Sequence, residues 1–187
     1  EQTGDIPYTR KLYTKADSLC IYFPEYLDLC QRIHNDLQDS SWIHAIYENL
    51  LGKCDDYHKY NGLVDGILLT LKDEDWARKI YSGLEEKCVQ ETDFGKLATI
   101  VNEKFGDKEW VQRLLTTAEE KAQDLSGRIF VAGSVLSLLS DNEWAKSIYT
   151  QAEAGCSDRD HYYKLFTSIW SQTHDKELLR QMHRSAE

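Results

Sequence analysis

Proline, methionine and long apolar runs are scarce in this chain of 187 residues, which has two prolines and one methionine. No apolar run approaches the roughly 18–20 residues that a membrane-spanning helix needs, so we expect no membrane span. The alternation of apolar and polar residues that marks β-strands is absent, which excludes sheet-based folds. Glycine-rich phosphate loops, GxSxG, HExxH and Asp-rich metal loops are also missing. We therefore predict that the chain is not an enzyme and needs no cofactor.

Basic residues are outnumbered in this chain. It has 22 Lys and Arg against 32 Asp and Glu, a formal net charge of −10. Nucleic-acid binding depends on Lys and Arg side chains that neutralise phosphates, so the charge argues against a nucleic-acid partner and against an anionic membrane surface. The charge is typical of a soluble protein. Where charge contributes to recognition, it favours a basic protein or peptide as the partner.

Tryptophan recurs in the chain at a fixed interval. Four of the five tryptophans lie 34 residues apart: Trp42, Trp76, Trp110 and Trp144. Tyr8 and Leu178 extend this register by one interval in each direction. A fixed interval of about 20–50 residues is the mark of a repeat array. We predict a single helical-repeat domain over residues 1–187, which is either complete or, because both ends fall at half-repeats, a fragment of a longer array.

An aspartate stands three residues before each position of the tryptophan column. The six are Asp5, Asp39, Asp73, Asp107, Asp141 and Asp175. Within one copy, Trp76, Ile80 and Leu84 follow one another at spacings of four, which places them on one apolar stripe of an α-helix. A carboxylate at the start of a helix accepts hydrogen bonds from the N–H groups of the first turn. We predict that these aspartates are helix N-caps and not catalytic groups.

A second apolar stripe lies between the tryptophan segments. Its most regular columns are Leu29, Leu63, Leu97, Val131 and Leu165, then Ile33, Ile67, Val101, Val135 and Ile169. The spacing of four again indicates a helix, and Gly106 stands where a helix C-cap is expected. The predicted fold class is all-α: a right-handed α-α solenoid of antiparallel helix pairs, with about eleven helices and a 34-residue repeat.

Four glycines lie inside this second type of helix: Gly62, Gly66, Gly95 and Gly133. Each costs about 1 kcal/mol of helix stability relative to alanine. Glycines at such a cost indicate a close approach, either by a neighbouring helix or by the backbone of a ligand.

The cysteines follow the repeat as well. Cys20, Cys54, Cys88 and Cys156 share one column, which has Ala122 in the remaining copy. A column that accepts Cys or Ala favours a small packed side chain. Equivalent positions on successive helices lie about 10 Å apart, which is too far for a disulfide, and no CxxC or HxxxH pair offers zinc ligands. We predict packed thiols, no metal site and a reducing, cytoplasmic location.

The unit resembles tetratricopeptide and half-a-tetratricopeptide repeats. The interval of 34 residues is the same, and the segment Ala77–Glu85 is similar to their second helix, as are Ala145, Tyr149 and Ala152. The glycine and the closing proline of those repeats have no counterpart here, where Thr99 stands near the glycine position. The resemblance implies a scaffold that binds a protein or peptide on a concave face, which the helix without tryptophan lines.

Six residues of that face are candidate binding residues: His34, Asn61, Asp65, Asn102, Tyr163 and Trp170. Asn61, Asp65 and Asn102 have polar groups suited to a peptide backbone. Tyr163 and Trp170 are of the types enriched at binding hot spots. Trp170 has a second interpretation, as a core side chain that covers the last helix.

A mostly basic row should run along one edge of the stack: Arg10, His44, Arg78, Gln112, Lys146 and Arg180. Two interpretations stay open for it. The row is either a solvated helix face or a strip that contacts an acidic segment of a partner.

Two functions of different classes fit the sequence best, and a third interpretation, an enzyme with a site built across repeats, has no residue spacing that nominates it. The first is a protein–protein interaction scaffold that docks a peptide or protein on its concave face. The alternative is an acidic inhibitor or immunity-type protein that covers the basic active surface of a toxin or enzyme. The small size and the net charge of −10 favour the alternative, whereas the even spread of acidic residues along the chain favours the scaffold.

Overall fold

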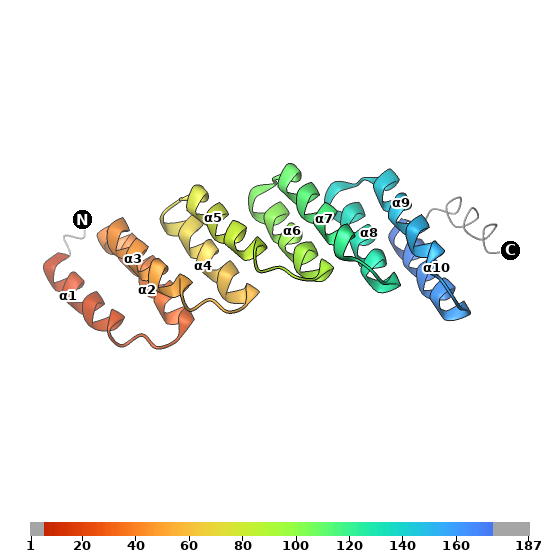
Figure 1. Ribbon diagram of the computed structural model, residues 1–187. Coiled ribbons are helices and arrows are strands. Elements are labelled where there is room, and N and C mark those ends of the chain that lie inside the picture. Colours follow the sequence, from red (N-terminus) through yellow and green to blue (C-terminus); the bar gives the residue numbers. More distant parts are fainter. Residues whose placement is uncertain (1–5, 174–187) are drawn as a thin grey trace. The chain divides into compact units, whose positions relative to one another are not determined.

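The computed structural model describes residues 6–173, which form ten helices and their connections. The helices appear in chain order from α1 in red to α10 in blue (Figure 1). The predicted all-α fold is confirmed for this part of the chain. The eleventh predicted helix, which would begin at Asp175, lies outside the described residues, as does the predicted cap Asp5. Two compact units divide the chain, residues 1–84 and 85–187, and the single domain stays a prediction.

The first unit contains two kinds of helix in alternation. The helices that hold the tryptophan column, here called tryptophan helices, are α1 (Ile6–Asp17), α3 (Ser40–Leu51) and α5 (Glu74–Glu85), which ends at the unit boundary. The intervening helices are α2 (Phe23–Leu37) and α4 (Tyr57–Thr70). Each helix from α1 to α4 packs against the next, and α2 also packs against α4. Packing in which each helix contacts only helices close to it along the chain is typical of an α-α solenoid.

The second unit repeats this order. Its intervening helices are α6 (Glu91–Phe105), α8 (Leu125–Leu139) and α10 (Arg159–Thr173), and its tryptophan helices are α7 (Lys108–Lys121) and α9 (Asn142–Ala154). Consecutive helices pack together, and the intervening helices also pack on one another, α6 on α8 and α8 on α10. The core combines the two regular columns of the intervening helices, which include Leu97 and Val101, with the apolar stripe of the tryptophan helices, which includes Leu114.

The intervening helices α2, α4, α6 and α8 are each joined to the following tryptophan helix by the same turn. The residue before the aspartate is left-handed, with φ between 51° and 62°: Gln38, Lys72, Gly106 and Ser140. The aspartate then accepts the backbone N–H of the tryptophan three residues later at 2.9–3.0 Å: Asp39, Asp73, Asp107 and Asp141. The N-cap prediction is confirmed for these four. In the sequence, Gly106 is the only one of these four residues that indicates a left-handed conformation.

The tryptophans connect successive tryptophan helices through their indole N–H groups. In the second unit, Trp110 Nε1 donates to Glu85 Oε2 at 2.8 Å, and Trp144 Nε1 donates to Glu119 Oε2 at 2.7 Å. In the first unit, Trp42 Nε1 lies 3.4 Å from Asp17 Oδ2. Each acceptor stands 25 residues before its tryptophan, and aspartate, one methylene shorter than glutamate, makes the longest of the three bonds. At the same place before Trp76 stands Leu51, which has no carboxylate.

The basic row lies against the tryptophan rings of the first unit. The Arg10 guanidinium lies 5.6 Å from the centroid of the Trp42 ring, and the His44 ring stacks on Trp76 with centroids 4.1 Å apart. Cations and flat rings gain attraction from the face of an indole. Arg10 also forms an ion pair with the N-cap Asp39. Arg10 and His44 therefore have partners within the chain, which gives this part of the row a structural role.

Buried tyrosines occupy the aromatic column of the tryptophan helices. Tyr47, Tyr81 and Tyr149 are fully buried. The Tyr47 hydroxyl lies 3.2 Å from Thr70 Oγ1, and the Tyr149 hydroxyl donates to Gln172 Oε1. Burial raises the pKa of Tyr149 to about 12, so the hydroxyl stays protonated and available as a donor. Each of these bonds ties a tryptophan helix to the intervening helix that follows it.

The glycines of the intervening helices lie under side chains of neighbouring helices. A Cβ built on Gly95 of α6 would be 2.4 Å from Phe130 Cε1 of α8, and one on Gly133 would be 2.8 Å from the Gln172 amide of α10. The close approach predicted for these glycines is confirmed, and at both positions a neighbouring helix makes it.

The left-handed turn position allows a paired stability test. Replacing Lys72 by glycine should raise the free energy of unfolding by about 0.5–1 kcal/mol, because a left-handed non-glycine residue costs roughly 1–2 kcal/mol and glycine loses more chain entropy on folding. Replacing Gly106 by alanine should lower it by about 1 kcal/mol. Urea-induced unfolding measures both. A Gly106→Ala protein as stable as wild type would contradict the shared role of this column.

The packing of Gly95 gives a second test. Gly95→Ala should lower the free energy of unfolding by about 1–3 kcal/mol, because the Phe130 ring must move from its packed position. The matched control is Gly83→Ala in α5, where an added Cβ meets nothing within 4 Å. That substitution should stabilise the protein by about 0.5–1 kcal/mol. Equal effects of the two changes would show that Phe130 adapts without cost.

The indole bonds give a third test. Trp144→Phe removes the N–H that Glu119 accepts, whereas Trp76→Phe reduces the ring area that also stacks on His44 and removes no bond to position 51, because that residue is leucine. We expect Trp144→Phe to cost about 1–2 kcal/mol more free energy of unfolding than Trp76→Phe, the range for a hydrogen bond to a charged group at a half-buried site. If chemical denaturation shows the same loss of unfolding free energy for both variants, the indole hydrogen bond does not contribute to stability.

Candidate functional site

The candidate residues of the first unit lie on α2 and α4. His34 and Asn61 are half-buried, and Asp65 is exposed. Asn61 Oδ1 accepts a hydrogen bond from the buried Tyr81 hydroxyl at 2.7 Å. The Asn61 amide oxygen is therefore engaged in packing α4 against a tryptophan helix, and of these three Asp65 offers the most accessible polar group.

Asn102 of the second unit is also engaged by its own chain. Its Oδ1 accepts from Lys108 Nζ at 2.8 Å, and the same ammonium donates to the Leu138 carbonyl at 2.6 Å. Lys108 thus joins α6, α7 and α8 at one end of the unit. Through this bond Asn102 positions a lysine that holds three helices together.

Tyr163 and Trp170 lie on one face of α10, together with Phe166. Their spacing of three and four residues places the three side chains on the same side of the helix. Tyr163 is 71% exposed, Phe166 47% and Trp170 42%. The structure thus brings two of the six candidate residues together and adds a third aromatic side chain. We call Tyr163, Phe166 and Trp170 the aromatic face.

Phe166 differs in both size and exposure from the rest of its repeat column. The other members are small or medium side chains that are completely buried: Cys30, Val64, Ala98 and Ala132. At Cys30, Ala98 and Ala132 the next intervening helix also packs on the helix that holds the position. Within residues 6–173, α10 is the last intervening helix, so its outer side has no such neighbour. The sequence feature that could have identified Phe166 is its size: it is a large aromatic residue in a column of smaller side chains.

Few charges accompany the aromatic face. The charged residues of α10 are Arg159, Asp160 and Lys164, and Lys164 Nζ donates to Ser126 Oγ at 2.6 Å. The net charge of −10 is therefore not concentrated on this helix. Exposed aromatic rings with few charges around them suit hydrophobic anchoring better than electrostatic attraction.

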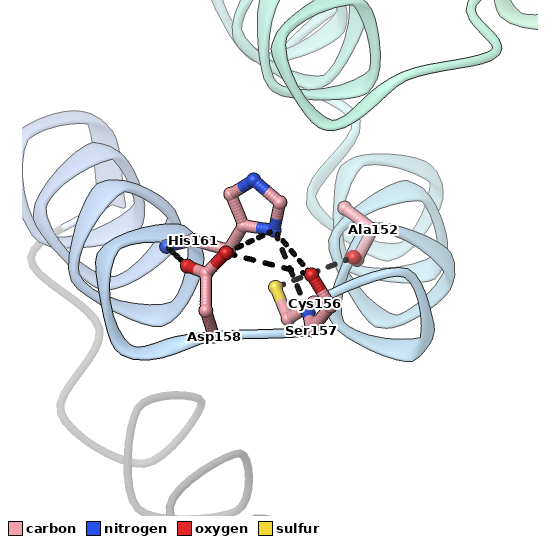
Figure 2. Close-up of polar contacts among 5 residues, drawn as sticks. All are labelled: Ala152, Cys156, Ser157, Asp158 and His161. Carbon is pink, nitrogen blue, oxygen red and sulfur yellow. Dashed lines mark hydrogen bonds and ion pairs between the residues drawn. The ribbon is translucent and has the colours of Figure 1, made fainter.

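Cys156, Ser157, Asp158 and His161 gather at the start of α10 and resemble a nucleophile with its base. Ser157 Oγ lies 3.3 Å from His161 Nδ1, and Asp158 Oδ2 lies 3.7 Å from the same nitrogen. Figure 2 shows both residues approaching one ring nitrogen while the other points away. A Ser-His-Asp triad needs the hydroxyl and the carboxylate on opposite nitrogens, so this arrangement cannot relay a proton.

The cluster is a helix cap. Asp158 Oδ1 accepts the backbone N–H of His161 at 2.9 Å, which lowers the pKa of that carboxyl, and His161 Nδ1 accepts the N–H of Ser157 at 3.4 Å. Glu25 and Asp93 accept the equivalent N–H groups at the starts of α2 and α6. Burial raises the pKa of the Cys156 thiol, which disfavours the reactive thiolate. We assign the cluster a structural role.

A pocket of about 280 Å³ lies in the first unit between α1, α2 and α3. Its walls include Asp17, Tyr26, Trp42 and Lys53, and the Lys53 ammonium lies 4.9 Å from the centroid of the Tyr26 ring. The volume is just below the range of about 300–1,000 Å³ for small-molecule sites. The chain's own lysine already covers one aromatic wall.

Within the described range, no group of three or more His, Cys, Asp and Glu side chains is arranged to hold a metal ion. None of the ten described helices combines the length and the apolar composition needed to cross a membrane. Comparison with known proteins gives no further assignment: no protein-family model, no curated protein and no solved structure matches this chain.

Proposed function

We propose that the protein is an interaction scaffold that binds a protein or peptide partner through its intervening helices, with the aromatic face of α10 as the anchor. The observation that supports this proposal is the exposure of Tyr163, Phe166 and Trp170 on one helix face. Exposed apolar patches on folded domains mark interaction sites, and Trp and Tyr dominate the energetics of such sites. The chain has no catalytic role in this proposal.

The partner we propose offers an apolar segment or groove that accepts two or three aromatic rings. Thr167 of α10 is exposed among them. Such polar side chains suit the rim of an interface, where they bond to backbone groups of the partner. The tetratricopeptide resemblance supports the same helix type as the binding surface.

The experiment compares wild type with a Phe166→Ala/Trp170→Ala variant as bait in lysate of the source cells. The partner captured by wild type is purified and its affinity measured by calorimetry. We expect the variant to bind at least tenfold more weakly, because truncated aromatic hot spots cost about 2 kcal/mol or more. Both side chains are more than 40% exposed, so the variant should keep its fold, which circular dichroism checks.

The matched control is Val89→Ala, which truncates an apolar side chain that is 71% exposed in the connection before α6 and lies outside the intervening helices. Its affinity should equal that of wild type. A partner that binds the aromatic variant as tightly as wild type, and is released by salt, would contradict the proposal and favour an acidic inhibitory surface.

A further inference from the structure

The first helix exposes an apolar column that is buried in the other tryptophan helices. Tyr8 and Leu12 share one side of α1, and Leu12 is 49% exposed. The residues at the column of Leu12 in the later copies are Ile46, Ile80, Leu114 and Ile148, which are 0–6% exposed. None of the residues of α1 is buried. The sequence of α1 is thus that of a tryptophan helix, but its apolar side faces solvent.

The later copies show what covers this column. Helix α3 packs between the intervening helices α2 and α4, α7 between α6 and α8, and α9 between α8 and α10. Helix α1 packs against α2, which follows it, and among the described residues no intervening helix precedes it. The uncovered side of α1 is therefore equivalent to the side of α7 that contacts α6.

The charge of α1 is opposite to that of the whole chain. The helix has Arg10, Lys11 and Lys15 against the single acid Asp17, in a protein with a net charge of −10. Lys15 lies within the apolar stripe, and Lys11 lies beside it; both are exposed. Arg10 pairs with Asp39 and so belongs to the fold. A partner for this side should therefore combine apolar side chains with acidic ones.

We propose that α1 is a second docking surface, separate from the aromatic face, which binds an amphipathic α-helix of a partner protein. The chemistry of that helix follows from the intervening helices: apolar residues at i, i+4 and i+8, as in Leu97, Val101 and Phe105 of α6, with acidic residues beside them. Leu12 and Tyr8 accept the apolar stripe, and Lys11 and Lys15 face the acidic flank. Helix-in-groove binding uses the same spacing of anchors.

The test uses the full chain, labelled with ¹⁵N, and a peptide of residues 91–105 as the probe. In the chain this segment covers α7 in the way that the proposed partner would cover α1. We expect NMR shift changes confined to α1 and its connection to α2. Leu12→Asp should weaken binding at least tenfold, and Lys11→Glu/Lys15→Glu should weaken it in a salt-dependent way. A scrambled peptide should cause no shifts.

Leu69→Asp is the matched control for a charge placed on an exposed leucine, and it should bind the peptide like wild type. The Phe166→Ala/Trp170→Ala variant should also bind it like wild type, so this result is independent of the proposed function. Shifts that spare α1, or a Leu12→Asp protein that binds normally, would overturn the proposal. So would a concentration-dependent dimer in sedimentation that Leu12→Asp abolishes, since a second copy would then be the occupant.

Discussion

The two-residue turn between an intervening helix and the following tryptophan helix is the constraint on which the rest of the fold depends. A left-handed residue ends one helix, and an aspartate starts the next by accepting the N–H of the tryptophan. Because the same turn occurs four times at the same register, it places Trp42, Trp76, Trp110 and Trp144 at the same distance from the start of their helices. The indole bonds and the buried tyrosine column follow from that placement.

Residues that differ from the other members of their repeat column are informative, because the other copies are so regular. Phe166 and Leu12 occupy columns that are buried in the other copies, and both are about half exposed because the repeat has no further neighbour there within the described range. Arg128 is a different kind of departure. In the other copies its place on the intervening helix is taken by an aromatic residue, Tyr26, Tyr60, Phe94 or Tyr162. Its Nε nevertheless donates to the carbonyl of Ala122, six residues back, as the Tyr26 hydroxyl donates to that of Cys20. The repeat thus preserves a bond while the residue type changes.

The sequence predicted the features that depend on residue type and spacing. The helix pairs, the aspartate caps and the packed glycines followed from the 34-residue register, because apolar period and capping are local properties. The left-handed backbone conformation at Gln38, Lys72 and Ser140 was not predicted, because only a glycine indicates that conformation in a sequence. For the candidate site, column position identified Tyr163 and Trp170. It could not show that Tyr81 and Lys108 bind Asn61 and Asn102, because those bonds join residues of different helices.

The cysteine column gives the protein a set of internal reporters of local opening. Cys54 and Cys156 each donate from Sγ to a backbone carbonyl four residues earlier, at 3.4 and 3.6 Å, and Cys20 and Cys88 occupy the same half-buried position. Burial raises the pKa of Cys30, deeper in the core, to about 12. The fully buried Cys30 reacts with a labelling reagent only after the helices around it open, and the half-buried thiols react faster once their helix pair opens. The rate of labelling at each cysteine would therefore map, pair by pair, which parts of the array unfold first and which hold the others in place.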